Sequence, residues 1–355
     1  MKRCYHLVAA AVLMTCLAAC NECETQQEPA EGVLSVSVRN GAAFATKADT
    51  SPSGKDADLR DVQLLLFSSD GSLYRRETFS GSSPTLTLER IKTGYYDVVA
   101  VANAPALTDV LNLAELTERE LSLSLNDPEQ GFVMYGQTSV VVTSAKESAT
   151  AARAEITVTR HVGRVRLTTV QNGLPAAYGA LQVACAFLEN GFGTWNYGGT
   201  GDPSGYVNYA GRKAGKNASA VAADFISSGS DADCAALTFR SLDKTVTNGG
   251  TETVNHPFYS FPNSLTSDGD HFSGATSEAA CVRLVVKASY GEGDAQSWYY
   301  PVTIENLERN KTYDVSFIIR GPGSPDPNQQ VENGNLDVVI SVDPWNDGGD
   351  FNGDF

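Results

Sequence analysis

Residues 154–170 read AEITVTRHVGRVRLTTV, a long stretch in which apolar and β-branched residues dominate. Residues of these types favour β-strands. The stretch lies near the middle of a 355-residue chain that is 42% hydrophobic, which is enough chain for two domains with separate cores. We therefore expect it to carry the chain from an N-terminal domain, residues 48–158, into a C-terminal domain, residues 159–355.

Short strand patterns separated by turn residues lie on both sides of this stretch. Two apolar runs flank the turn SSDG at residues 68–71, which is typical of a hairpin. Further strand patterns occupy residues 85–91, 94–105, 132–143, 281–290, 297–304, 312–323 and 335–345. Many short strands with little helix indicate β-sandwiches, and the length of the chain indicates two of them.

Residues 108–122 break this rhythm, because their apolar residues recur at helical spacing. Thr117 and Glu120 have the spacing of a capping box. We expect one or two short helices here, set between strands of the N-terminal domain.

The first strand pattern is VLSVSV at residues 33–38. Leu34, Val36 and Val38 alternate with Ser35 and Ser37, and this two-residue period is typical of a strand with one buried face. We expect the three apolar residues to fill the edge of a sandwich.

The N-terminus has the features of an export signal. Residues 1–19 combine Lys2 and Arg3 with an apolar run at residues 7–17, which is shorter than the roughly 20 residues that span a bilayer. The run closes in LAAC, and this order resembles the lipobox of bacterial lipoproteins, which implies acylation of Cys20. An ordinary signal peptide with a chance cysteine is the alternative. Lipoprotein acylation supplies more than one lipid chain, and firm anchoring in a membrane requires more than one.

The charge of the chain excludes some classes of partner. The sequence has 26 basic and 42 acidic residues, a formal net charge of −16, and removal of Lys2 and Arg3 with the signal leaves 24 against 42, or −18. An acidic surface argues against nucleic-acid binding and against electrostatic binding to membranes.

The sequence contains no constellation that indicates catalysis, a cofactor or a metal. His161 lies in a strand-rich stretch next to a basic residue, and we interpret it as structural. The acidic loops at residues 266–274 and 343–355 could hold calcium but lack EF-hand spacing, so turns are the preferred interpretation. Outside the N-terminal region the cysteines are Cys185, Cys234 and Cys281, for which three buried thiols are favoured over one bridge.

Trp195, Tyr197 and Tyr206 lie in a glycine-rich stretch, GFGTWNYGGTGDPSGY at residues 191–206. They could form a sugar-binding face. A long loop anchored by aromatic residues is the preferred interpretation.

Residues 308–345 resemble the C-terminal region of the FimA-type fimbrillins, the shaft subunits of type V pili. The shared features are Arg-Asn, a strand that begins at a tyrosine, Gly-Pro-Gly, a proline-rich loop and a strand that ends in Pro-Trp. Residues 95–116, 132–142, 158–167 and 297–302 match in the same order. The predicted fold is all-β, with two β-sandwich (transthyretin-like) domains and short helices in the N-terminal domain.

The resemblance implies processing of a lipidated propeptide, residues 20–47, that contains the first strand. In the family a protease cuts after a basic residue and before a small one, in the loop that follows this strand. Lys47 and Ala48 occupy the corresponding place, and Arg39 and Asn40 are the second choice. The lysine departs from the arginine of the best-known members, which implies a protease with a different preference.

Loss of the first strand would expose an apolar groove with unpaired backbone groups, and such an edge recruits a strand from another chain. When a strand of each subunit fills the groove of the next, the series of contacts does not close into a ring, so it builds a filament. Leu336, Val338, Ile340 and Val342 alternate in a strand that is either the donor or the last strand of the C-terminal domain. The tail that follows, NDGGDFNGDF, is less apolar than the tails of shaft subunits.

We therefore predict a structural subunit of a surface pilus with a role in adhesion and biofilm formation. Its expected partners are copies of itself and accessory pilus subunits. It would begin as a lipid-anchored precursor at the outer membrane and end in the extracellular fimbria, with no enzymatic activity. The alternatives are a pilus anchor or tip subunit that keeps Cys20, and a glycan-binding surface lipoprotein that depends on Trp195.

Overall fold

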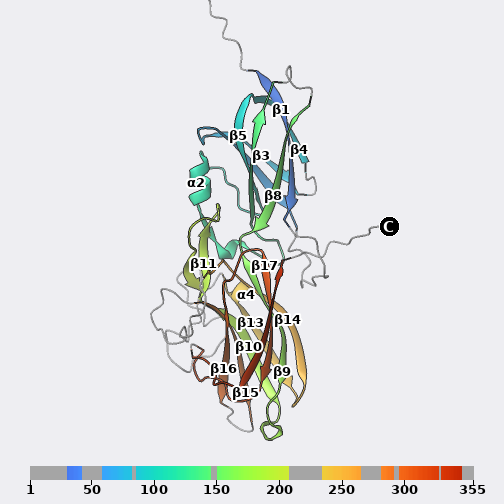
Figure 1. Cartoon of the computed structure of the whole chain (residues 1–355), viewed down its shortest axis with the longest axis vertical. Helices are drawn as coiled ribbons and strands as arrows, with labels where there is room; N and C mark the ends of the chain where they lie inside the picture. The colour runs from blue at the N-terminus through green and yellow to red at the C-terminus, as the bar shows by residue number, and fades with distance from the viewer. Residues whose placement is uncertain are drawn as a thin grey trace, which may run out of the picture.

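The computed structural model of the chain consists of two β-sandwiches arranged end to end along its long axis (Figure 1). The structure describes residues 30–41, 58–81, 85–144, 150–207, 234–264, 281–291, 296–327 and 329–345. The all-β fold with two sandwiches and short helices in the N-terminal half, as predicted from the strand patterns, is confirmed.

The N-terminal sandwich forms from one sheet of seven strands in the order β3-β2-β5-β7-β8-β1-β4. The sheet folds over where β7 meets β8, because those two strands pair at only two positions. Side chains from β1, β2, β4, β5, β7 and β8 fill the core between the resulting layers. The strands are β1 (Glu31–Asn40), β2 (Asp61–Ser68), β3 (Leu73–Ser80), β4 (Thr85–Lys92), β5 (Gly94–Ala102), β7 (Met134–Val142) and β8 (Ala152–Arg160).

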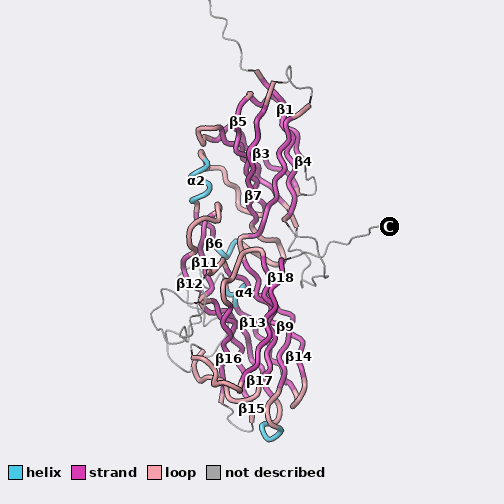
Figure 2. Tube along the Cα trace, in the orientation of Figure 1, coloured by secondary structure: helices cyan, strands magenta, loops and turns pink. Residues whose placement is uncertain are grey.

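The C-terminal sandwich packs the sheet β13-β10-β15-β16 against the sheet β14-β9-β17-β18. In the second sheet β9 and β17 are parallel neighbours, and β18 lies at one edge with β14 at the other (Figure 2). The strands are β9 (Gly163–Asn172), β10 (Leu181–Glu189), β13 (Phe239–Val246), β14 (Thr251–Ser260), β15 (Val282–Tyr290), β16 (Ser297–Ile304), β17 (Lys311–Ile319) and β18 (Leu336–Pro344).

A third, small sheet joins the two sandwiches. It has the order β12-β11-β6, and β6 comes from the N-terminal half while β11 and β12 come from the C-terminal half. Its strands are β6 (Glu120–Ser122), β11 (Gly191–Asn196) and β12 (Ser204–Val207), and the remaining short elements are α2 (Leu113–Glu118), η1 (Leu123–Leu125), η2 (Ala176–Tyr178) and α4 (Ala235–Thr238). A buried apolar cluster with members from both halves surrounds this junction.

The stretch 154–170 divides at this junction. It belongs to β8 as far as Arg160 and to β9 from Gly163, and these strands lie in different sandwiches. A Cβ atom at Gly163 would lie 2.6 Å from the carbonyl oxygen of Glu308, so glycine is needed for this close passage.

Two details of the predicted structure are wrong: the capping residues of α2 and the place of β1 in its sheet. The N-cap of α2 is Asn112, whose Oδ1 accepts a hydrogen bond from the backbone N–H of Glu115, while Thr117 lies inside the helix and donates to the carbonyl of Leu113. Glu115 reaches back to the N–H of Leu111. The capping pair is therefore Asn112 and Glu115, because an Asn side chain caps as well as a Ser or Thr side chain does. The second detail is the position of β1, described next.

Candidate functional site

Strand β1 is an interior strand and not the edge strand that the sequence suggested. It pairs in parallel with β8, from Leu34 opposite Ala152 to Asn40 opposite Val158. On its other side it pairs antiparallel with β4, from Glu31 opposite Lys92 to Ser37 opposite Thr85. Removal of β1 therefore creates two sheet edges that face each other across the width of one strand.

The two faces of β1 differ as its alternation predicts. Leu34 and Val36 are 0% exposed and Val38 is 1% exposed, and all three belong to the core of the N-terminal sandwich. Burial of three such side chains contributes roughly 5–9 kcal/mol before the cost of ordering the strand is subtracted. Their removal would leave an apolar groove of the same shape.

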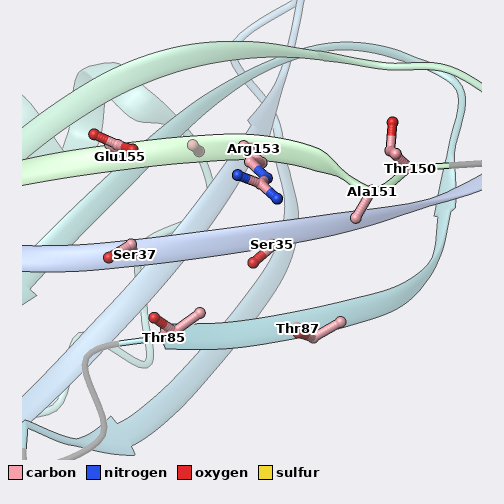
Figure 3. Close-up of a pocket in the computed structure, with 9 residues that line it drawn as sticks. Ser35, Ser37, Thr85, Thr87, Thr150, Ala151, Arg153 and Glu155 are labelled. Carbon is pink, nitrogen blue, oxygen red and sulfur yellow. The ribbon is translucent and has the colours of Figure 1, made fainter.

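The outer face of β1 lies in an open hollow (Figure 3). Ser35 and Ser37 form its centre, flanked by Thr85 and Thr87 of β4 on one side and by β8 on the other. Small hydroxyl side chains dominate this face, and neither serine is fully buried. Of the side-chain contribution to the binding of β1, the inner face therefore provides most and the outer face little.

Segment 42–57 connects β1 to the rest of the N-terminal sandwich. Lys47 and Ala48 lie in this segment, which is outside the described residues. Cys20, further upstream, is also outside the described residues. Arg39 and Asn40 are within β1, opposite Thr157 and Val158, and the Nε of Arg39 donates to the Oγ1 of Thr157 over 3.1 Å. A protease needs an extended segment that is free to pair with it. The peptide bond after Arg39 is therefore protected as long as β1 stays paired with β8.

Strand β18 carries the other predicted residues, and it occupies an edge. It pairs with β17 along nine residues, and no other strand that the structure describes lies on its other side. Leu336 and Val338 pack partly against the core of the C-terminal sandwich, whereas Ile340 and Val342 are 40% and 50% exposed. Apolar residues on an unpaired edge are unusual, because such edges invite pairing with other chains.

Trp345 follows β18 directly and is fully buried at the junction of the two sandwiches. Its ring stacks on Tyr259 at 5.6 Å between centroids and meets Phe132 edge-on at 5.2 Å. The guanidinium carbons of Arg160 and Arg164 each lie 4.5 Å from the ring centre, which is a favourable distance for cation–π attraction. We call Phe132, Arg160, Arg164 and Tyr259 the Trp345 socket.

This socket was not predicted from the sequence. Arg160 and Arg164 are buried, although strand charges usually face solvent. Their partners include Asn310, whose Oδ1 accepts from Arg160 over 3.1 Å, and Thr312, whose Oγ1 accepts from Arg164 over 3.0 Å. Basic residues inside an apolar, β-branched stretch were the available signal.

A family model described as "Fimbrillin-A associated anchor proteins Mfa1 and Mfa2" matches residues 24–347. The chain belongs to this Mfa1/Mfa2 family. Its members are fimbrial proteins, so the chain is a fimbrial, cell-surface protein of a structural kind.

Solved structures share the fold of this Mfa1/Mfa2-family chain at low identity. A candidate cell adhesion protein from Bacteroides eggerthii has a TM-score of 0.61 at 17% identity, over 89% of this chain and 97% of that one. A candidate cell adhesion protein from Parabacteroides distasonis has a TM-score of 0.58 at 17% identity, over 90% of this chain and 100% of that one. The fimbrilin FimA of Porphyromonas gingivalis W83 has a TM-score of 0.56 at 15% identity, over 89% of this chain and 98% of that one. No curated protein matches the sequence.

His161 lies in the junction of this Mfa1/Mfa2-family chain and is fully buried. Its ring meets Trp195 edge-on at 5.4 Å and Tyr135 at 6.0 Å. Burial lowers the pKa of His161 to about 3, and the positive charge of Arg309 acts in the same direction. The imidazole is therefore neutral at physiological pH, which fits the structural role predicted for it.

Trp195 borders a hollow that it shares with residues 306–309, Pro262 and Ser264. The guanidinium carbon of Arg309 lies 5.9 Å from its ring centre, and its indole N–H donates to the carbonyl of Gly201. Tyr197 is buried, so it does not belong to a sugar-binding face, and the side chain of Tyr206 lies outside the described residues. The two visible aromatic residues anchor their loop.

Cys185, Cys234 and Cys281 are all buried, as the preferred interpretation predicts. Within the described ranges no group of three or more metal-ligating side chains comes together. Loop 266–274 and most of loop 343–355 lie outside those ranges. Of the helices that the structure describes, none is long and apolar enough to span a membrane.

Proposed function

We propose that this chain is a fimbrial subunit that is exported as a lipoprotein acylated at Cys20, cut after Lys47 and assembled by strand exchange. The observation that carries the proposal is the position of β1, a single strand buried between two others and joined to its domain only through segment 42–57. One cut in that segment would leave β1 held by non-covalent contacts alone.

A strand from another subunit would fill the vacated groove by the same two kinds of contact. Backbone groups of β4 and β8 would pair with it on both sides, which avoids the cost of leaving them unsatisfied. Alternate apolar side chains would take the places of Leu34, Val36 and Val38. Because each subunit would offer a groove to the next, the assembly grows into a filament.

We assign the donated strand to β18. Its residues Leu336, Val338, Ile340 and Val342 have the two-residue spacing that the groove accepts. On the edge of its own sandwich, Ile340 and Val342 are 40–50% exposed, whereas the groove positions are 0–1% exposed. Transfer would therefore bury apolar surface that the isolated subunit leaves in water, at about 25 cal/mol per Å².

Mass spectrometry of the surface form tests this proposal. A structural subunit has its N-terminus at Ala48 and forms SDS-resistant ladders. An anchor, the role after which the family model is named, keeps acylated Cys20 and an intact Lys47–Ala48 bond. A monomeric surface form with the lipidated N-terminus in place would overturn the subunit proposal in favour of the anchor.

A further inference from the structure

The site that accepts a strand and the strand that we assign as donor are connected through the Trp345 socket. Trp345 comes directly after β18, and Arg160 of the socket comes directly from β8, the strand on which β1 lies. We propose that the Trp345 socket holds β18 in its own subunit until β1 has left, so that the strand is released only after processing. This inference rests on the proposed function and concerns its regulation.

Beside its ladder with β17, the second half of β18 is attached through the Trp345 socket. In the part of the chain that the structure describes, β17 is the one neighbour of this strand, and the side chains at Ile340 and Val342 are half-exposed. Trp345, by contrast, is fully buried, and its backbone N–H donates to the carbonyl of Asn310 over 3.0 Å. The strand can therefore leave β17 only if the indole leaves the socket.

Arg160 is the last residue of β8, the strand that pairs with β1. Strand β8 pairs with β1 at seven consecutive positions, from Ala152 to Val158. With β7 it pairs at two positions only, Arg160 opposite Met134 and Thr159 opposite Tyr135. Without β1, the strand pairing of β8 among the described residues is reduced to these two pairs with β7. Arg160 belongs to one of the two pairs.

Loss of β1 therefore loosens one wall of the socket. The guanidinium of Arg160 also binds Asn310, the residue whose carbonyl receives the Trp345 N–H. A shift of β8 would thus disturb a cation–π contact and the loop that holds the tryptophan backbone at the same time. The opposite order, release of β18 before β1 leaves, would expose apolar strands with no groove to receive them.

Hydrogen exchange of the backbone amides of β8 and β18 tests this coupling in three forms of the precursor from residue 21 onward. The first form is uncut, and the second is cut within segment 42–57 and freed of β1 by gel filtration under mildly denaturing conditions. The third form is the second after addition of a synthetic peptide of residues 30–41. We expect β18 amides to exchange at least about tenfold faster in the second form and to regain their protection in the third.

Each other outcome has a distinct meaning. If β8 amides lose protection in the second form while β18 amides do not, β1 has left without effect on the socket, and the coupling is wrong although the proposed function stands. If β1 cannot be withdrawn after the cut, or the peptide does not rebind, the proposed function fails and the coupling fails with it.

A pair of tryptophan variants in the uncut chain tests the socket separately. Trp345→Ala should make β18 amides exchange at least about tenfold faster while β8 amides keep their protection. Trp298→Ala is the matched control, since Trp298 lies on β16 and packs partly against the core of the C-terminal sandwich, outside the socket. Equal exchange of β18 in both variants would show that the socket does not hold the strand.

Discussion

Val36 of β1 lies opposite Ala154 of β8 in a parallel register, and both side chains are buried in the core of the N-terminal sandwich. The pairing fixes which face of β1 points inward along its whole length, since a slip of one residue would bury Ser35 and Ser37 instead. A replacement strand has to satisfy the same register. Apolar residues at two-residue spacing are thus the requirement that the groove imposes on any donor.

A negative charge introduced on the inner face of β1 should have a much larger effect on stability than the same charge on the outer face. Val36→Asp places a carboxylate in the core and should lower the free energy of unfolding of the N-terminal sandwich by more than about 3 kcal/mol, because a buried charge without a partner is costly. Ser35→Asp, one residue away on the outer face and opposite Arg153, should change it by less than about 0.5 kcal/mol. Urea unfolding of the uncut precursor measures both. Equal stability of the two variants would contradict the orientation of β1.

The cut after Lys47 is tested by two lysine variants in the same segment. Lys47→Gln removes the basic residue that the protease recognises and should leave the precursor with β1 attached. Lys55→Gln is the matched control, because Lys55 lies further along the same segment and precedes an acidic residue instead of a small one. Mass spectrometry of the surface form reads out the N-terminus. Normal processing of Lys47→Gln would refute this assignment and require another cleavage site.

The donor assignment predicts that one face of β18 matters for assembly. Val342→Asp changes a half-exposed side chain, so the monomer should lose no more than about 1 kcal/mol of stability. In the groove of a neighbour the same carboxylate would be buried, and SDS-resistant ladders should disappear. Ser341→Asp puts the charge on the opposite face and should leave the ladders in place. Ladders that survive Val342→Asp would show that β18 is not the donated strand.

The sequence predicted what local alternation determines. The inward face of β1, the hairpin at residues 68–71 and the strand β18 follow from period-two patterns and turn residues, which act over a few positions. Alternation does not say which strands become neighbours. The interior place of β1 depends on pairing with β4 and β8, which lie some 50 and 120 residues further along the chain.

The Trp345 socket shows the same limit more sharply. Phe132, the pair Arg160 and Arg164, and Tyr259 come from three separate places in the chain and meet only when both sandwiches are formed. Trp345 was recognisable as part of a Pro-Trp ending, but its partners carry no common local pattern. Contacts of this kind are set by tertiary structure and not by spacing.

His161 predicts a pH dependence of stability at the junction. Burial first, and the charge of Arg309 second, lower its pKa from the ordinary 6.5 to about 3 in the folded chain. Between these values the unfolded chain binds a proton that the folded chain does not, so stability is complete above pH 6.5 and falls as the pH decreases toward 3, by up to about 1.4 kcal/mol per pH unit. His161→Phe keeps a ring against Trp195 and removes this titration.

Urea unfolding of both proteins at pH 6.5 and pH 5 measures the difference. From pH 6.5 to pH 5, the wild-type free energy of unfolding should fall by about 1.6 kcal/mol more than that of His161→Phe. The pKa of His256, lowered by burial to about 4, adds a similar slope to both proteins and cancels in the comparison. Carboxylates cancel in the same way. Parallel pH profiles would mean that the His161 imidazole can take up its proton without unfolding, and that the junction admits water more readily than its packing indicates.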